Sequence, residues 1–234
     1  MTFTGWPHAA LDFYVGLEAD NSKAYWVANR DTYDTCVKEP FLALSDMIER
    51  EFGPLHLFRP NRDTRFSKDK TPYKTGAAAV TESEGGAGYY VQISAEGLFA
   101  GSGYYHLASD QLQRFRDAVA DNRTGPKLAT AVADLRTKKY EVAARESLKR
   151  APRGFDPEHP RVELLRMKGV HVGRTFGTPR WIHGRGRGPR DDCLARRGPR
   201  ESLARPQRGS EHARARGTRL NTADAAPVLP RRNP

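Results

Sequence analysis

The chain has 234 residues, of which 38% are hydrophobic, and a formal net charge of +11. This length suits one domain with a full core, or one domain with an appendage. No apolar run approaches the roughly 20 residues that cross a membrane, and no basic stretch precedes an apolar segment at the N-terminus. We therefore expect no membrane partner, no signal peptide and a cytoplasmic location.

The first part of the chain has the residue spacing of helices. We expect three of them, at about residues 7–18, 21–38 and 40–52. The third has the clearest pattern, because apolar residues recur every three or four positions on one face: Phe41, Leu44, Ile48 and Phe52. Gly53 and Pro54 then end this helix.

The spacing changes to that of strands after Gly53. Strands are expected at residues 55–57, 77–81 and 89–95, and a tight turn at Glu96-Gly97 leads into a further strand at 98–100. Helices follow at about residues 110–119, 125–137 and 162–167, and a last strand at 170–175. This order predicts an α+β fold with N-terminal helices, further helices, and an antiparallel sheet that carries a hairpin and is covered on one side.

The connection between the first two strands is unusually basic. Residues 58–75 contain six cations and only two acids, Asp63 and Asp69, and the cations are Arg59, Arg62, Arg65, Lys68, Lys70 and Lys74. The aromatic residues Phe66 and Tyr73 lie among them. Arginine offers a planar fork for phosphate or carboxylate, and lysine offers a mobile point charge. We call residues 58–75 the basic loop.

The basic loop is the best candidate for a site, because loops held by a rigid sheet commonly carry binding groups. The leading hypothesis is that it binds an anionic or phosphate-bearing small molecule. The candidate ligand-binding residues are Arg62, Arg65, Lys68, Lys70, Tyr73 and Lys74. The opposing interpretation is that Asp63 pairs with Arg62 or Arg65, that Asp69 pairs with Lys68 or Lys70, and that these ordinary ion pairs only order the loop.

Two other functions remain open. In the first, the chain is an enzyme in which Asp63 or His106 performs acid–base chemistry while Arg62, Arg65 and Lys70 hold the substrate. In the second, the loop and the arginines of the C-terminal region bind nucleic acid. Whether the chain is an enzyme at all is left open by the sequence.

No recognisable cofactor or metal motif occurs. The chain lacks the patterns HExxH, GxSxG and the phosphate-binding P-loop, and Cys36 and Cys193 have no metal-ligand spacing. We predict no cofactor and no metal. The Gly101-Ser-Gly sequence lacks the third glycine of a dinucleotide fingerprint.

The composition changes sharply near Gly184. Residues 184–234 contain thirteen arginines, no lysine and five acids, a net charge of +8 that leaves +3 for residues 1–183. Gly, Pro, Ala and Arg make up 32 of these 51 residues. We therefore predict one domain at residues 1–183 and a disordered tail at 184–234, because so few large apolar side chains cannot offset the entropy of ordering.

Two origins of this tail are open. It is either a basic arm that binds an acidic surface, or the product of a shifted reading frame. Codons for Gly, Pro, Ala and Arg are the richest in G and C, so a frameshift in a GC-rich gene would give this composition. Thirteen arginines without one lysine favour the frameshift.

The segment Arg62–Lys74, with the sequence RDTRFSKDKTPYK, is the most distinctive part of the chain. Together with residues 6–41 and 150–169, it resembles the domain-of-unknown-function family 2461 over about residues 3–183. The resemblance implies a single α+β domain, an uncharacterised function and no transferable catalytic residue. Family members continue into a closing amphipathic helix, whereas this chain has GRGRGPRDD after His183, which also favours the frameshift.

Overall fold

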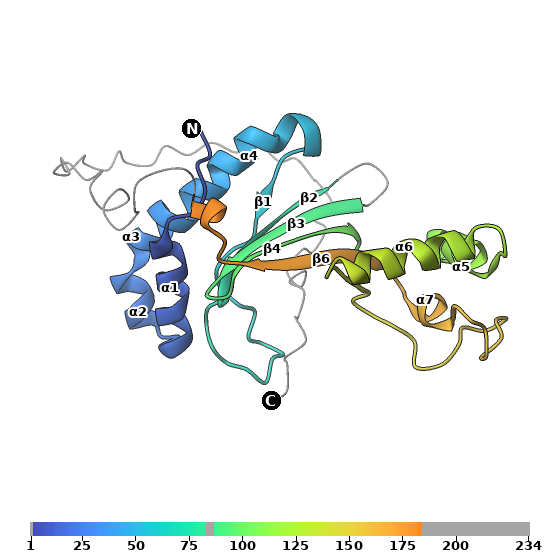
Figure 1. Ribbon diagram of the computed structural model, residues 1–234. Coiled ribbons are helices and arrows are strands. Elements are labelled where there is room, and N and C mark those ends of the chain that lie inside the picture. Colours follow the sequence, from blue (N-terminus) through green and yellow to red (C-terminus); the bar gives the residue numbers. More distant parts are fainter. Residues whose placement is uncertain (1, 83–86, 184–234) are drawn as a thin grey trace, which may run out of the picture.

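The computed structural model describes residues 2–82 and 87–183, so the predicted tail at 184–234 lies outside the described residues. N-terminal helices lie toward one end of a central sheet, and the later helices lie beyond its other end (Figure 1). The N-terminal helical elements are α1 (His8–Ala19), α2 (Lys23–Ala28), α3 (Arg30–Thr32), the π-helix η1 (Tyr33–Lys38) and α4 (Glu39–Phe52). The strands are β1 (His56–Leu57), β2 (Gly76–Glu82), β3 (Ala87–Ser94), β4 (Gly97–Tyr104), β5 (Glu141–Ala143) and β6 (Val170–Gly177). The remaining helices are α5 (Ser109–Ala120), α6 (Gly125–Thr137), α7 (Val162–Arg166) and the 3-10 helix η2 (Arg180–His183).

The first helices follow from local sequence signals. The hydroxyl of Ser22 accepts a hydrogen bond from the backbone N–H of Tyr25 at 3.1 Å and so caps α2. Pro40 occupies the first turn of α4, where its missing N–H has no consequence, and Gly53 ends α4 with a φ of 80° that glycine adopts without strain. The predicted helices at 7–18 and 40–52 are therefore confirmed.

The predicted helix at 21–38 is divided into three pieces. A short α2 and α3 are followed by six residues of π-helix, η1. The wider turn of a π-helix shifts the following side chains, and here Tyr33, Cys36 and Val37 all become buried. The phenolic ring of Tyr33 and the thiol of Cys36 belong to the core, which agrees with a structural role for Cys36.

The sheet is antiparallel throughout, in the order β1-β2-β3-β4-β6-β5. The β3–β4 hairpin is confirmed, and its turn is closed by Gly97 at a φ of 97°. β4 runs to Tyr104, beyond the predicted strand at 98–100. β5 was not predicted. It follows α6 after Lys139, which adopts a φ of 64° and turns the chain back into the sheet.

Both hydrophobic clusters use the same face of the sheet. The first cluster, under α1–α4, takes sheet residues such as Ala79, Ile93 and Leu98. The second, under α5–α7, takes Val142 and Val172. The strand register places all of these on one side, which we call the first face. Among the described residues, neither cluster contains a residue of the second face, so the predicted one-sided covering is confirmed.

The twist of the sheet explains why the two helix groups point in different directions in Figure 1. Neighbouring strands rotate by about 20–25° relative to each other, so one continuous face turns substantially from β1 to β5.

Within the described residues, no helix is long and apolar enough to span a membrane.

Candidate basic-loop site

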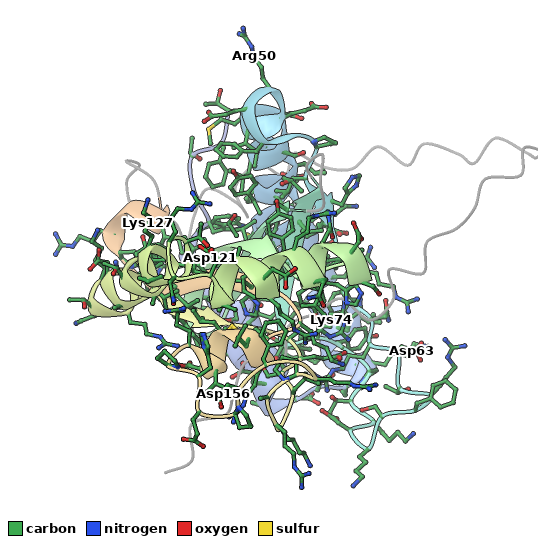
Figure 2. The ribbon with its side chains drawn as sticks, turned by 90° about the vertical axis from the view of Figure 1, so that its right-hand side faces the viewer. Arg50, Asp63, Lys74, Asp121, Lys127 and Asp156 are labelled. Carbon is green, nitrogen blue, oxygen red and sulfur yellow. The ribbon has the colours of Figure 1, made fainter. Side chains whose placement is uncertain are left out.

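The basic loop begins and ends as a short antiparallel ladder. Asn61 and Tyr73 form a β-bridge, and two backbone hydrogen bonds of 2.9 Å flank it, from Arg62 N to Pro72 O and from Lys74 N to Pro60 O. The loop is therefore a narrow extension of the β1–β2 hairpin. Figure 2 shows Lys74 close to the body of the domain and Asp63 farther out.

The ladder is fixed to the helical layer through Tyr73. The side-chain amide of Asn21 donates to Tyr73 O and accepts from Tyr73 N, both at 3.0 Å. The ring of Tyr73 is 7% exposed and stacks on Trp26 with a centroid separation of 4.4 Å and an interplanar angle of 9°. Tyr73 thus belongs to the first hydrophobic cluster. The membership of Tyr73 in the ligand set stays a prediction, and its 7% exposure leaves little of the side chain open to a ligand.

Two ion pairs order the outer part of the loop. Arg65 makes a forked contact with Asp63, in which Nη2 lies 2.6 Å from Oδ2 and Nε lies 3.0 Å from Oδ1. Arg62 binds Asp69 and also donates to the hydroxyl of Thr71 at 2.5 Å. The predicted pairing is therefore confirmed for Asp63, which pairs with Arg65, whereas Asp69 pairs with Arg62 and not with Lys68 or Lys70.

These contacts hold both carboxyl groups in the ionised state. Hydrogen bonds from the side chain and backbone of Arg65 lower the pKa of Asp63 to about 2. Hydrogen bonds from the backbone and hydroxyl of Thr71, followed by Arg62, lower the pKa of Asp69 to about 2. A carboxylate of such low basicity is a weak general base, and it holds no proton to donate near neutral pH.

The tip of the loop is open to solvent. Lys70 donates from Nζ to the carbonyl oxygen of Thr64 at 2.9 Å, and Lys68 is exposed. Phe66 is 96% exposed, with the guanidinium of Arg65 5.9 Å from its ring centre. The tip therefore presents the ring of Phe66, whereas the ring of Tyr73 is in the core.

Three cations gather at the base of the loop, and we call Arg59, Arg62 and Lys74 the stem cluster. Lys74 is partly buried, with Nζ 5.3 Å from the centre of the Phe58 ring. Burial, and then the charges of Arg59 and Arg62, lower the pKa of Lys74. Among the described residues, no carboxylate forms an ion pair with Lys74 or Arg59. The stem cluster therefore carries positive charge that the fold itself does not fully neutralise.

The sequence matches the family described as "Conserved hypothetical protein (DUF2461)" over residues 9–187. The chain belongs to the DUF2461 family. The match covers the whole basic loop and extends four residues beyond the predicted domain boundary at His183. No curated protein and no solved structure matches this DUF2461 chain.

The fold of this DUF2461 chain separates the two candidate acid–base residues. The basic loop leads into Gly76, which pairs with Ser94, whereas His106 follows Tyr104, which pairs with Ala87. Seven residues of β3 separate these two ends, or about 23 Å at roughly 3.3 Å per residue. The acid–base roles of Asp63 and His106 stay predictions that this separation disfavours, and His106 is an exposed residue near Glu146.

Other metal and site candidates add little. No group of three or more His, Cys, Asp or Glu side chains that could hold a metal occurs among the described residues.

Sequence reasoning overlooked Asn21, because its contact with Tyr73 joins positions 52 residues apart. It also left Arg59 out of the ligand set. Arg59 could have been included because the two ends of the basic loop are extended, and their antiparallel pairing brings residues 59 and 74 close together.

Proposed function

We propose that this protein binds a small molecule bearing a phosphate or carboxylate group, and that the stem cluster makes the contact. The observation that carries the proposal is the state of Lys74, a partly buried cation whose pKa is lowered by burial and by two further cations. Like charges held close to one another are unfavourable, and a bound anion would reduce that repulsion. The anchored ladder supplies the rigid support that such a site needs.

In this proposal the candidate residues have different tasks. Arg59 and Lys74 have charge available for the ligand, and Arg62 can contribute Nη2 while its Nη1 stays on Asp69 and Thr71. Arg65 and Lys70 order the loop through Asp63 and Thr64. Lys68 lies at the solvent-exposed tip, where it can attract an anion without fixing its position.

A thermal-shift experiment on the full chain tests the proposal with pyrophosphate as the probe. A ligand at 100 times its Kd stabilises the native state by about 2.7 kcal/mol, or roughly 5–10 °C for a domain of this size. We expect pyrophosphate to raise the Tm of the wild type more than sodium chloride of equal ionic strength. Lys74→Met should abolish the difference.

The matched control is Lys127→Met, because Lys127 is exposed on α6, away from the basic loop (Figure 2). It removes the same charge and should retain the full response to pyrophosphate. Equal shifts in Lys74→Met and Lys127→Met would contradict the proposal, since they would mean that pyrophosphate acts on the overall charge of the chain.

A further inference from the structure

The tip of the basic loop presents an aromatic ring to solvent. Phe66 is 96% exposed, and Val27, the next most exposed large apolar side chain among the described residues, is 64% exposed. A single exposed apolar residue is common on protein surfaces and needs no explanation by itself. The surroundings of Phe66 therefore decide whether its ring has a task.

Hydrogen bonds order the chain on both sides of Phe66. The backbone N–H of Arg65 donates to Asp63 Oδ1 at 3.2 Å. On the other side of the ring, Lys70 Nζ donates to the carbonyl oxygen of Thr64 at 2.9 Å, which closes the tip across its base. The ring is thus presented by an ordered segment, so a partner that binds it does not have to order the tip first.

Cationic groups surround the ring. The guanidinium carbon of Arg65 lies 5.9 Å from the ring centre of Phe66. Lys68 is exposed beside it, and Lys70 keeps two of its three N–H donors after its bond to Thr64. A partner that fits this tip therefore carries negative charge and offers a surface that can cover an aromatic ring.

The ion pair between Arg65 and Asp63 distinguishes between partners of this kind. Inserting the ring of Phe66 into lipid or into a closed apolar pocket would also take this neighbouring ion pair out of water, which is costly. A nucleic-acid base covers only the face of a ring and leaves such a pair hydrated, and bases stack on guanidinium planes as well as on aromatic rings. The geometry therefore favours a base over an apolar partner.

We infer that the tip of the basic loop binds single-stranded nucleic acid, with one base stacked on Phe66 and the adjoining phosphates at Lys68 and Lys70. Stacking on an aromatic ring tolerates every base, so binding is independent of sequence. The ring of Tyr73 is 7% exposed and belongs to the core, so the loop stacks one base and not two. The site does not rest on the stem cluster, whose cations lie at the base of the loop.

A titration of the full chain with two fluorescently labelled strands tests the inference at physiological ionic strength. One strand is a short oligothymidylate, and the other is an abasic strand of the same length, which carries the same phosphates without bases. The wild type should bind the oligothymidylate at least fivefold more tightly, and Phe66→Ala should remove this preference. The arginine-rich residues 184–234 are present in every variant, so their contribution is common to all.

Two further variants separate stacking from a general apolar contact. Phe66→Leu keeps an apolar side chain without an aromatic face and should bind like Phe66→Ala. Phe66→Trp should bind at least as tightly as the wild type, and its added fluorescence should be quenched by the oligothymidylate and not by the abasic strand. The matched control is Met47→Ala, which removes a 58% exposed apolar side chain from α4 and should leave both Kd values unchanged.

The exposure of Phe66 also separates lost binding from lost folding. Because its ring buries almost no surface, Phe66→Ala should leave the Tm unchanged. Equal Kd values of the wild type for the two strands, or a Phe66→Leu variant that binds as tightly as the wild type, would overturn the inference. So would binding to phosphatidylcholine vesicles containing phosphatidylserine that Phe66→Ala abolishes and Phe66→Leu retains, since the ring would then dock on lipid.

Discussion

Asn21 holds the main chain of Tyr73 through both atoms of its side-chain amide, with two hydrogen bonds of 3.0 Å. The amide takes the place of a neighbouring strand, since it pairs with the N–H and the C=O of one residue. This contact joins the connection between α1 and α2 to the base of the basic loop, and it fixes the position at which the stem cluster begins.

Replacing Asn21 with alanine should therefore loosen the loop more than the sheet. Two hydrogen bonds are lost and the backbone groups of Tyr73 are left without partners, a cost of about 1–3 kcal/mol. Amide hydrogen exchange should become faster at Tyr73 in the variant. The exchange rate at the Ala79 amide in β2 should change much less. Equal acceleration at both amides would show that Asn21 supports the whole domain instead.

The ion pairs of the loop predict a defined acid response. A carboxyl group whose pKa is lowered in the folded state stabilises that state above its unfolded pKa, and the contribution is lost as pH falls through the folded value. For Asp63 this window lies between about 4, the unfolded value, and about 2. A carboxyl ¹³C titration should show Asp63 titrating near pH 2, and Arg65→Ala should move it back toward pH 4.

Asp121, at the C-terminal end of α5, provides a control for that titration. Hydrogen bonds from the backbone N–H groups of Thr124 and Arg123 lower its pKa. Arg65→Ala should leave the titration of Asp121 unchanged. If Asp63 still titrates near pH 2 in Arg65→Ala, the contact between Asp63 and Arg65 is not what holds its carboxylate.

Replacing Gly125 in α6 with alanine should destabilise the protein, which is the opposite of the usual effect of this change in a helix. Gly→Ala in a helix normally stabilises by up to about 1 kcal/mol. A Cβ on Gly125, however, would lie 2.1 Å from Val119 O and 2.5 Å from Arg161 Nε. It would displace Arg161, which donates to Val119 O at 2.6 Å and to Ala120 O at 2.9 Å at the end of α5.

We expect Gly125→Ala to destabilise the protein by about 1–3 kcal/mol in urea unfolding, because overpacking a filled site costs that much. Thr130→Ala on the same helix is the comparison, and it should change stability by less than about 0.7 kcal/mol through helix propensity. A more stable Gly125→Ala variant would mean that Arg161 is not required at the end of α5.

Elements whose pattern lies within a short stretch of sequence could be predicted, whereas features without such a local pattern could not. The α4 helix was predictable because Phe41, Leu44, Ile48 and Phe52 carry the pattern within one element. The π-helix was not, because a change from i+4 to i+5 hydrogen bonding leaves no marker in the residues Tyr33–Lys38. β5 has three residues, too few to show an alternating pattern, and depends on the turn at Lys139.

The same reasoning applies to the site. The basic character of the loop was evident from its composition, but its division into ion-paired tip and unneutralised stem depends on which acid meets which arginine. The burial of Tyr73 depends on Trp26, 47 residues earlier in the sequence. Similarly, the sequence did not show that the basic loop and His106 adjoin opposite ends of β3, which follows only from the strand register.

The C-terminal region is open to a direct test. We propose that residues 184–234 result from a shifted reading frame, since the family match ends at residue 187 and the following composition is rich in arginine without lysine. Translation of the other two frames of the gene after the codon of His183 should give an amphipathic helix in one of them. Finding none in either frame would support a selected basic arm instead.

The central claim is that the stem cluster is an anion site, and the charge state of Lys74 tests it most directly. The pKa of Lys74 can be followed by ¹³Cε NMR in the full chain, with Lys127 as an internal reference. In the free protein it should lie below the ordinary value for lysine, and saturating pyrophosphate should raise it, because the bound anion stabilises the charged form. A pKa for Lys74 that stays unchanged, or that moves only as much as that of Lys127, would contradict the account.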